Sequence, residues 1–318
     1  MMLEEEAFAP SEVLLRNISL LSQEQSVLQE RRICELAAVA DAASEYLASM
    51  DAGGMPLVDA LSLLFFESED APRPPADAIK ECVPSLFLHL GMLSVLDKIS
   101  LTLLLGECLK KRDLRLTEAD FLAPSGAPET FTYVKNLYAD EAYDVFAQDF
   151  SDPRIFYSET LKDAVAAVAE GRAGYCLLPL EEKGGARLAT VSEMLYRSDL
   201  RIASVTPVYG YGEENDLTYA LISRGFRIPP VEKDDDRYLE LRIPKNACPL
   251  SELMVALEGF GIEVYRIHSL RVSVEGERKA FYSLVFRAEG KDFVPLLTHL
   301  SIFFKDFTPI GIYASLET

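Results

Sequence analysis

The stretch Ala173-Gly-Tyr-Cys-Leu-Leu-Pro-Leu-Glu-Glu-Lys-Gly-Gly185 decides the fold of the central part of the chain. Its first half is a short apolar run, typical of a strand, and it follows an amphipathic helical pattern over residues 159–172. Its second half is charged and ends in paired glycines, which indicates a turn, and a new helical pattern begins near Ala189. An α/β domain presents backbone N–H groups and carboxylates to a ligand in this way, at the carboxyl ends of parallel strands. We therefore expect a functional site in this stretch.

Length and composition indicate a soluble protein with more than one domain. A chain of 318 residues has room for two or three domains of ordinary size. Its 51 acidic and 31 basic residues give a formal net charge of −20. A nucleic-acid backbone would be repelled by that field, so we expect no nucleic-acid partner. General solubility is the simplest explanation of the acidity.

The cysteines and histidines argue against a metal site. The five cysteines are odd in number and widely spaced, which predicts reduced core thiols of a cytoplasmic protein and not a disulfide framework. They are Cys34, Cys82, Cys108, Cys176 and Cys248. None of the histidines, His89, His268 and His299, stands at metal-ligand spacing from another histidine or a cysteine. We expect neither a metal nor another cofactor.

No segment reads as a signal peptide or a membrane span. Residues 1–6 are acidic where a signal peptide needs positive charge. The most apolar window, residues 86–105, contains Asp97 and Lys98 in its interior. Charges are costly in lipid, so this window predicts a buried helix.

The first third of the chain is predicted to be helical. Apolar residues recur at helical spacing over residues 11–50, and Gly53-Gly-Met-Pro56 ends that pattern. A second helix is expected from Pro56 to about Phe66 and a third from about Asp77 to Arg112. Three helices joined by turns predict a helical bundle of about 120 residues.

From Phe131 the period changes to strands that alternate with helices. Such alternation predicts an α/β domain with a mostly parallel sheet and right-handed crossovers. Strands are expected over residues 131–135, 155–158, 175–180, 201–208 and 217–223, and helices over 140–150, 159–172 and 190–197.

A polar stretch with two prolines, residues 227–237, separates this region from a third unit. There the predicted order is strand, helix, two strands, helix and strand, which is the ferredoxin-like βαββαβ motif. The strands are expected over residues 238–243, 262–274, 281–287 and 310–315, and the helices over 249–260 and 293–304.

Several motifs of the central region resemble those of the prephenate dehydratases. Leu178-Pro-Leu-Glu181 with Gly185, preceded by the helix at 163–171, resembles the family's helix, its strand ending in Pro-Ile-Glu-Asn-Ser, and its glycine turn. Tyr133-Val134 resembles the opening strand, and Asp216-Leu-Thr218 the start of the final Asn-x-Thr-Arg-Phe. The resemblance implies two lobes of the periplasmic-binding-protein type with a substrate cleft between them. Only about 38 residues separate Glu181 from Thr218, which implies that one lobe is contracted.

The resemblance also implies site residues. Thr218 matches the family's catalytic threonine, whereas Tyr219 stands where an arginine should clamp a substrate carboxylate. The implied catalytic residues are Thr218, Glu181 and Lys183, and the residues that would bind substrate are Gly185 and Arg187. The plainer interpretation is a strand threonine at Thr218, a solvated turn at Glu181-Glu182 and glycines that serve turn geometry.

Part of the first helix resembles that of the helical chorismate mutases. The similar segments are Leu15-Arg-Asn-Ile-Ser19 and Gln29-Glu-Arg-Arg32. The resemblance implies that Arg16, Arg31 and Arg32 bind the carboxylates of the substrate. The position where that family needs a lysine falls within residues 38–41, where Asp41 would repel a dianion. The alternative is a bundle with surface arginines.

The C-terminal unit resembles an ACT domain, the module that senses phenylalanine in prephenate dehydratases. Leu257-Glu-Gly-Phe260 and Gly311-Ile-Tyr-Ala-Ser315 carry the resemblance. It implies a regulatory ligand site, and a homodimer, because ACT units pair through their sheets. The site would comprise Ser251, Leu253, His268 and Ser269. His268 has the alternative role of a polar residue at a strand end or dimer interface.

The order of these units resembles the bifunctional chorismate mutase/prephenate dehydratases, also called P-proteins. The predicted multi-domain architecture is an N-terminal all-α bundle (1–125), a central α/β domain of periplasmic-binding-protein type with one lobe contracted (126–228), a linker (229–237) and a C-terminal α+β ferredoxin-like domain (238–318).

Three hypotheses for function follow from this architecture. The first is a divergent cytoplasmic member with reduced or lost catalysis, which senses a small carboxylate such as prephenate or an aromatic amino acid, or binds a partner. The second is an active prephenate dehydratase, which converts prephenate to phenylpyruvate, water and CO2, with chorismate mutase activity as a further option. The third is a scaffold without a small-molecule ligand.

Overall fold

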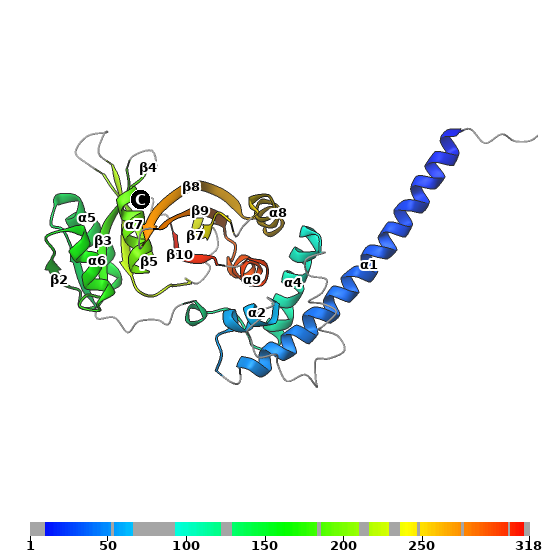
Figure 1. Ribbon diagram of the computed structural model, residues 1–318, viewed down its shortest axis with the longest axis horizontal. Helices are drawn as coiled ribbons and strands as arrows, with labels where there is room; N and C mark the ends of the chain where they lie inside the picture. Colours follow the sequence, from blue (N-terminus) through cyan, green and yellow to red (C-terminus); the bar gives the residue numbers. More distant parts are fainter. Residues whose placement is uncertain are drawn as a thin grey trace, which may run out of the picture.

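A computed structural model shows a mixed α/β protein with two sheets (Figure 1). The structure describes residues 10–51, 54–65, 93–121, 129–182, 186–209, 216–228, 236–246, 249–274, 277–304 and 306–314. Within these ranges, no helix is both long enough and apolar enough to cross a membrane.

The central sheet has the strand order β2-β1-β3-β6-β5, with the short β4 paired to β3. Its strands are β1 (Thr130–Tyr133), β2 (Arg154–Tyr157), β3 (Tyr175–Glu182), β4 (Ala186–Arg187), β5 (Arg201–Val208) and β6 (Leu217–Ser223). The accompanying helices are α5 (Leu137–Phe146), α6 (Leu161–Ala169) and α7 (Ala189–Ser198). Helix α6 begins two residues after the predicted start, behind a capping box in which Thr160 and Asp163 bond each other's backbone N–H groups.

The prediction of a mostly parallel sheet is wrong for half of it. Strand β1 is parallel to β2 and β3, but β6 is antiparallel to both β3 and β5. The segment between Val208 and Leu217 is too short for a crossover, so β6 returns beside β5 in the opposite direction. Pro179 does not end β3 but lies within it, where the pairing with β6 shifts, since proline has no N–H to donate.

The C-terminal unit has the predicted βαββαβ element order. Its elements are β7 (Asp236–Pro244), α8 (Leu250–Phe260), β8 (Glu263–Val274), β9 (Glu277–Glu289), α9 (Val294–Phe303) and β10 (Thr308–Ala314). The strands form an antiparallel sheet in the order β10-β7-β9-β8, as the ferredoxin-like motif requires. The alternation Leu239, Leu241 and Ile243 buries one face of β7 against α8 and α9.

The N-terminal helices are α1 (Pro10–Asp51), α2 (Leu57–Phe65) and α4 (Val95–Lys111). They do not enclose a separate core but pack on α8 and α9, so that one apolar cluster extends from α1 to the C-terminal sheet. Lys98 Nζ binds Glu252 at 2.8 Å, and Thr102 Oγ1 lies 2.9 Å from Nδ1 of His299. The prediction of a single helix through residues 77–112 is wrong at residues 93–94, because Ser94 caps the start of α4.

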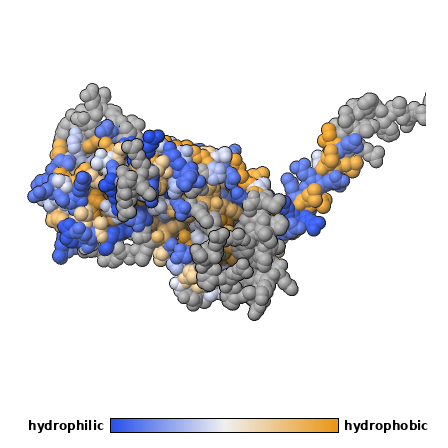
Figure 2. Space-filling view, in the orientation of Figure 1, coloured by the Kyte–Doolittle hydropathy of each residue, from blue (hydrophilic) through white to orange (hydrophobic). Residues whose placement is uncertain are grey.

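The first half of α1 extends away from the rest of the molecule (Figure 1). Apolar side chains on it are exposed, for example Leu21 at 64% and Leu28 at 66% (Figure 2). Cys34 lies on the same helix and is exposed, so the prediction of core thiols is wrong for this cysteine. Cys176 is buried as predicted.

Candidate functional site at the junction of the two sheets

Three of the predicted site residues meet at one end of the central sheet. In the strand pairing, Glu181 of β3 lies opposite Arg187 of β4 on one side and opposite Thr218 of β6 on the other. The glutamate side chain is only 14% exposed. The interpretation of Glu181 as part of a solvated turn is therefore wrong, although its neighbour Glu182 is exposed.

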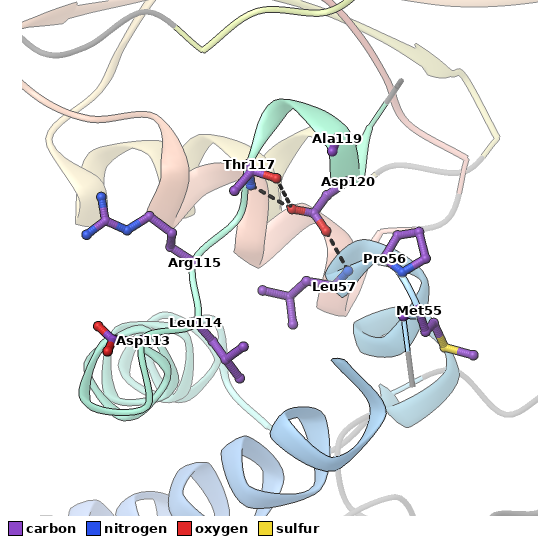
Figure 3. Close-up of a pocket in the computed structure, with 10 residues that line it drawn as sticks. Met55, Pro56, Leu57, Asp113, Leu114, Arg115, Thr117, Ala119 and Asp120 are labelled. Carbon is purple, nitrogen blue, oxygen red and sulfur yellow. Dashed lines mark hydrogen bonds between the residues drawn. The ribbon is translucent and has the colours of Figure 1, made fainter. Parts of the chain in front are cut away.

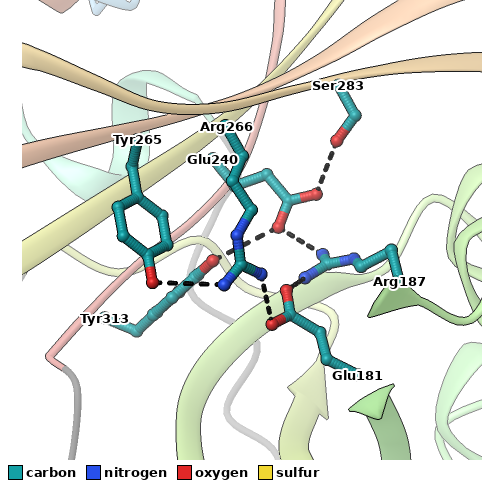
Figure 4. A network of polar contacts seen from close by, with 7 residues as sticks. All are labelled: Glu181, Arg187, Glu240, Tyr265, Arg266, Ser283 and Tyr313. Carbon is teal, nitrogen blue, oxygen red and sulfur yellow. Dashed lines mark hydrogen bonds and ion pairs between the residues drawn. The ribbon is translucent and has the colours of Figure 1, made fainter. Parts of the chain in front are cut away.

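Arg187 joins the two sheets (Figure 4). Its Nη1 donates to Oε1 of Glu181 at 3.0 Å, and its Nη2 donates to Oε2 of Glu240, which lies on β7 of the C-terminal sheet. The side chains of Arg187 and Glu240 are each 5% exposed. This buried ion pair thus connects the α/β part of the chain to the βαββαβ unit.

The remaining oxygens of both carboxylates are also occupied. Arg266 Nη1 donates to Oε2 of Glu181 at 2.6 Å. Ser283 Oγ donates to Oε1 of Glu240 at 2.9 Å, and the Tyr313 hydroxyl lies 3.4 Å from Oε2. Two carboxylates and two guanidinium groups therefore form a network that is electrically neutral and almost completely paired.

The surroundings keep Arg187 charged and the Tyr313 hydroxyl protonated. Burial disfavours the charge of Arg187, but the attraction of Glu240, followed by Tyr313 and Glu181, outweighs it and raises the pKa of Arg187. Burial and then the charge of Glu240 raise the pKa of Tyr313, which therefore stays protonated. Of the three guanidinium nitrogens of Arg187, only Nε lacks a hydrogen-bond partner among the described residues. Neither terminal nitrogen of this arginine is left unpaired for a substrate carboxylate.

Sequence reasoning missed Glu240, Arg266 and Tyr313. The alternation Tyr238-Leu-Glu-Leu-Arg-Ile243 shows a strand with one apolar and one polar face, and such a polar face is normally solvated. In the structure that polar face is covered by the central part of the chain. The available signal was the pair Glu240 and Arg242, two charged residues two positions apart on the polar face of a predicted strand.

The other residues expected to bind substrate do not join this network. Arg31 pairs with Glu35 at 3.1 Å, and Arg32 pairs with Asp97 at 2.7 Å, both on the helical side of the molecule. Lys183, Gly185 and the side chain of Arg16 lie outside the described residues.

The four residues expected to form a regulatory site have different environments. Ser251 is exposed in the first turn of α8, whereas Leu253 is fully buried in the core. His268 lies in the middle of β8, not at a strand end, and its Nε2 is buried without a hydrogen-bond partner in the described structure. Ser269 accepts a hydrogen bond from Nζ of Lys245 at 2.5 Å.

A separate groove of about 400 Å³ lies between the start of α2 and residues 113–120 (Figure 3). Asp120 lies beside it, but its Oδ1 accepts the N–H of Leu57 and its Oδ2 accepts the N–H and hydroxyl of Thr117. Because the carboxylate already caps two turns, we assign no ligand to this groove. Among the described residues, no group of histidine, cysteine and acidic side chains is placed to hold a metal.

No protein-family model matches the chain, and no curated protein matches it. Among solved structures, a prephenate dehydratase from Streptococcus mutans aligns with 58% of this chain and 98% of its own, with a TM-score of 0.46 and 14% sequence identity. One from Arthrobacter aurescens, described in complex with L-Phe, aligns with 58% of this chain and 90% of its own, at a TM-score of 0.42 and 15% identity. GqqA, described as a novel type of quorum quenching acylase, aligns with 59% and 96%, at a TM-score of 0.44 and 19% identity. The function proposed below rests on the side chains of this chain.

Proposed function

We propose that this chain is a divergent, cytoplasmic prephenate dehydratase-like protein of aromatic amino-acid metabolism that senses a small carboxylate instead of turning over prephenate. One observation carries the proposal. Arg187, which lies opposite Glu181 in the pairing of β3 with β4, binds Glu181 and Glu240 with its two terminal nitrogens. Arg187 thus connects two units of the protein. An arginine that binds a substrate carboxylate would instead need unpaired guanidinium nitrogens.

The chemistry of dehydration supports this interpretation. Loss of water and CO2 from prephenate requires a clamped dianion and a polarised leaving hydroxyl in a dry cleft. Tyr219, at the position of the family's arginine, is 3% exposed, and burial raises the pKa of its phenol. A neutral phenol cannot replace a bidentate guanidinium. In place of a substrate-binding arginine, the chain has the neutral side chain of Tyr219 and an arginine, Arg187, whose terminal nitrogens already bind two glutamates.

The sensing role is proposed for the βαββαβ unit, which resembles an ACT domain. A small carboxylate such as an aromatic amino acid would bind near Ser251, Leu253, His268 and Ser269. We further propose a homodimer through β8, the edge strand of the C-terminal sheet. Tyr265 and Ile267 on that strand are 46% and 47% exposed, and an apolar edge strand favours pairing with another strand.

Two measurements on the purified full-length protein test the proposal. Phenylpyruvate formation from prephenate should not exceed the spontaneous rate. Phenylalanine, tyrosine or prephenate should raise the midpoint of thermal unfolding, since a ligand that binds only the folded state stabilises it. Replacing His268 with alanine should abolish that rise. No stabilisation by any of the three compounds would favour the scaffold hypothesis.

An active prephenate dehydratase is the second candidate, and the position of Thr218 favours it. Its pairing with Glu181 places a hydroxyl-bearing residue directly opposite a carboxylate at the same end of the sheet. If turnover exceeds the spontaneous rate, Thr218→Val, which keeps the shape and removes the hydroxyl, should abolish it without unfolding the protein. Unchanged turnover in Thr218→Val and Arg187→Ala would exclude this site. An assay with chorismate would test the N-terminal helices in the same way.

A further inference from the structure

Arg242, on the polar face of β7, is buried and makes no ion pair with an acidic residue in the described part of the chain. Arg242 is 6% exposed, and its guanidinium lies over the ring of Tyr196 in α7, 4.6 Å from the ring centre. Within the described residues it forms neither a hydrogen bond nor an ion pair. Its nitrogens are not among the fully enclosed unpaired atoms of the described residues, so they keep some contact with solvent.

A further buried arginine, Arg201 at the start of β5, lies close enough to Arg242 for their charges to repel. Arg201 is 4% exposed. Its Nη1 donates to Oδ1 of Asp199 at 2.8 Å and to the carbonyl of Leu200 at 3.2 Å. Its Nε is buried and has no partner in the described part of the chain. Of the two buried guanidinium groups, only that of Arg201 is hydrogen-bonded to a carboxylate within the described residues.

The surrounding acids do not balance this charge. The side chain of Asp199 is 71% exposed, so much of its charge is screened by solvent. The two oxygens of Glu240 are already bonded by Arg187, Ser283 and Tyr313. Burial outweighs the attraction of Glu240 and, together with repulsion from Arg201, lowers the pKa of Arg242 to about 10, so Arg242 stays charged at neutral pH. An unpaired buried charge is costly, and a bound anion would remove that cost.

We propose that Arg242 and Arg201 form a binding site for a small oxyanion, a carboxylate or phosphate group, at the junction of β5, β7 and α7. Guanidinium groups suit this chemistry because their planar forks bind two oxygens of one anion. Tyr196 supports Arg242 from one side through the face of its ring. This site lies beside the Glu181–Arg187 network, whose Glu240 is two positions from Arg242 on β7, and it uses none of the proposed regulatory residues.

The test is thermal unfolding of the full-length protein at constant ionic strength, with chloride replaced stepwise by phosphate or by acetate. We expect the midpoint to rise with at least one of the two anions and to saturate. Because the chain has a net charge of −20, general adsorption of anions to the surface is disfavoured. Comparison of phosphate with acetate shows which oxyanion the site prefers.

Arg242→Met separates an anion site from a structural arginine. Methionine has a similar length and no charge, so the variant should be at least as stable as the wild type in chloride. Its affinity for phosphate or acetate, measured by calorimetry, should fall at least about tenfold. Arg201→Lys keeps the positive charge but loses the planar guanidinium group that binds two oxygens at once, and it should weaken binding as well. Arg154→Met, at an exposed arginine, is the control and should leave binding unchanged.

Three results would overturn the proposal. One is a midpoint that is the same in phosphate, acetate and chloride. Another is an anion response that persists in Arg242→Met. The last is strong destabilisation of Arg242→Met in chloride, which would mean that this arginine already has its partner within the fold.

Discussion

Gly311 in β10 lies directly against the backbone of Ile202 in β5, where the edges of the two sheets meet. A Cβ at residue 311 would overlap the carbonyl oxygen of Ile202 and lie 2.9 Å from its Cβ. The strand pairing is irregular on both sides, with a shift between Ile202 and Ser204 and another between Pro309 and Gly311. Such irregularities bend a strand. The close approach therefore depends on two local bends and on the absence of a side chain at residue 311.

Gly311→Ala should destabilise the protein. The added methyl group has to push the two strand edges apart, and overpacking of this kind costs about 1–3 kcal/mol. Urea unfolding followed by circular dichroism would measure the change. The matched control is Gly106→Ala in α4, where no atom lies within 4 Å of the added Cβ. That variant should be more stable by about 0.5–1 kcal/mol, because alanine favours a helix. Equal stability of Gly311→Ala and wild type would mean that the sheets separate freely.

Removal of one partner of the Arg187–Glu240 pair should be strongly destabilising. Arg187→Met leaves Glu240 as a buried carboxylate without its cation, at a cost of about 3–5 kcal/mol. The double variant with Glu240→Gln should recover part of this loss, with a coupling energy of about 1–3 kcal/mol. Chemical unfolding of the three variants would measure it.

The exposed pair Arg154–Asp152, with side chains 77% and 76% exposed, is the control for that double-mutant cycle. Its coupling should be below about 1 kcal/mol. A coupling at Arg187–Glu240 no larger than at this surface pair would contradict a structural role for the buried network.

Stability should fall below pH 6.5 because of His299. This residue is 1% exposed among aromatic rings of α8 and α9, and burial, followed by the charge of Lys98, lowers its pKa to about 3. Between pH 6.5 and pH 3 the unfolded chain binds a proton there and the folded protein does not. The free energy of unfolding therefore falls by about 1.4 kcal/mol per pH unit as pH decreases.

Urea unfolding of wild type and His299→Gln at pH 7.5 and pH 5.5 would isolate this contribution. Glutamine does not titrate but can still bond the hydroxyl of Thr102, which lies 2.9 Å from Nδ1 of the histidine. The wild type should lose roughly 1.4 kcal/mol more than the variant between the two pH values. An identical loss in both proteins would show that His299 takes up its proton normally.

Ile267→Lys should convert the proposed homodimer to a monomer. A lysine on an edge strand opposes pairing with a second strand, because it adds charge to the apolar surface. Size-exclusion chromatography with light scattering would give the mass at micromolar concentration. Val145→Lys, at an exposed position of α5, is the control. A dimer that survives in Ile267→Lys would direct attention to the exposed leucines of α1.

Local sequence patterns predicted the elements well. The strands Arg201–Val208 and Leu217–Ser223 have the predicted bounds, since apolar runs and their polar breaks are local properties. The direction of pairing was predicted less well, because it depends on which strands become neighbours in space. The start of α4 was missed because the capping box at Ser94 is inside an apolar window. For the candidate site, Glu181, Arg187 and Thr218 were predicted, and their partners on the other sheet were not.

The sequence by itself determined the order of helices and strands, the βαββαβ unit and the position of Glu181 at the end of an apolar strand. Periodicity and glycine placement encode these features within short segments. Only the tertiary structure decided that the polar face of β7 is buried, that Arg187 binds Glu240 and that Arg242 makes no ion pair with any acid among the described residues. Each of these facts depends on residues more than forty positions apart. Their contacts arise because two sheets pack together, and no pattern along one strand records what will cover it.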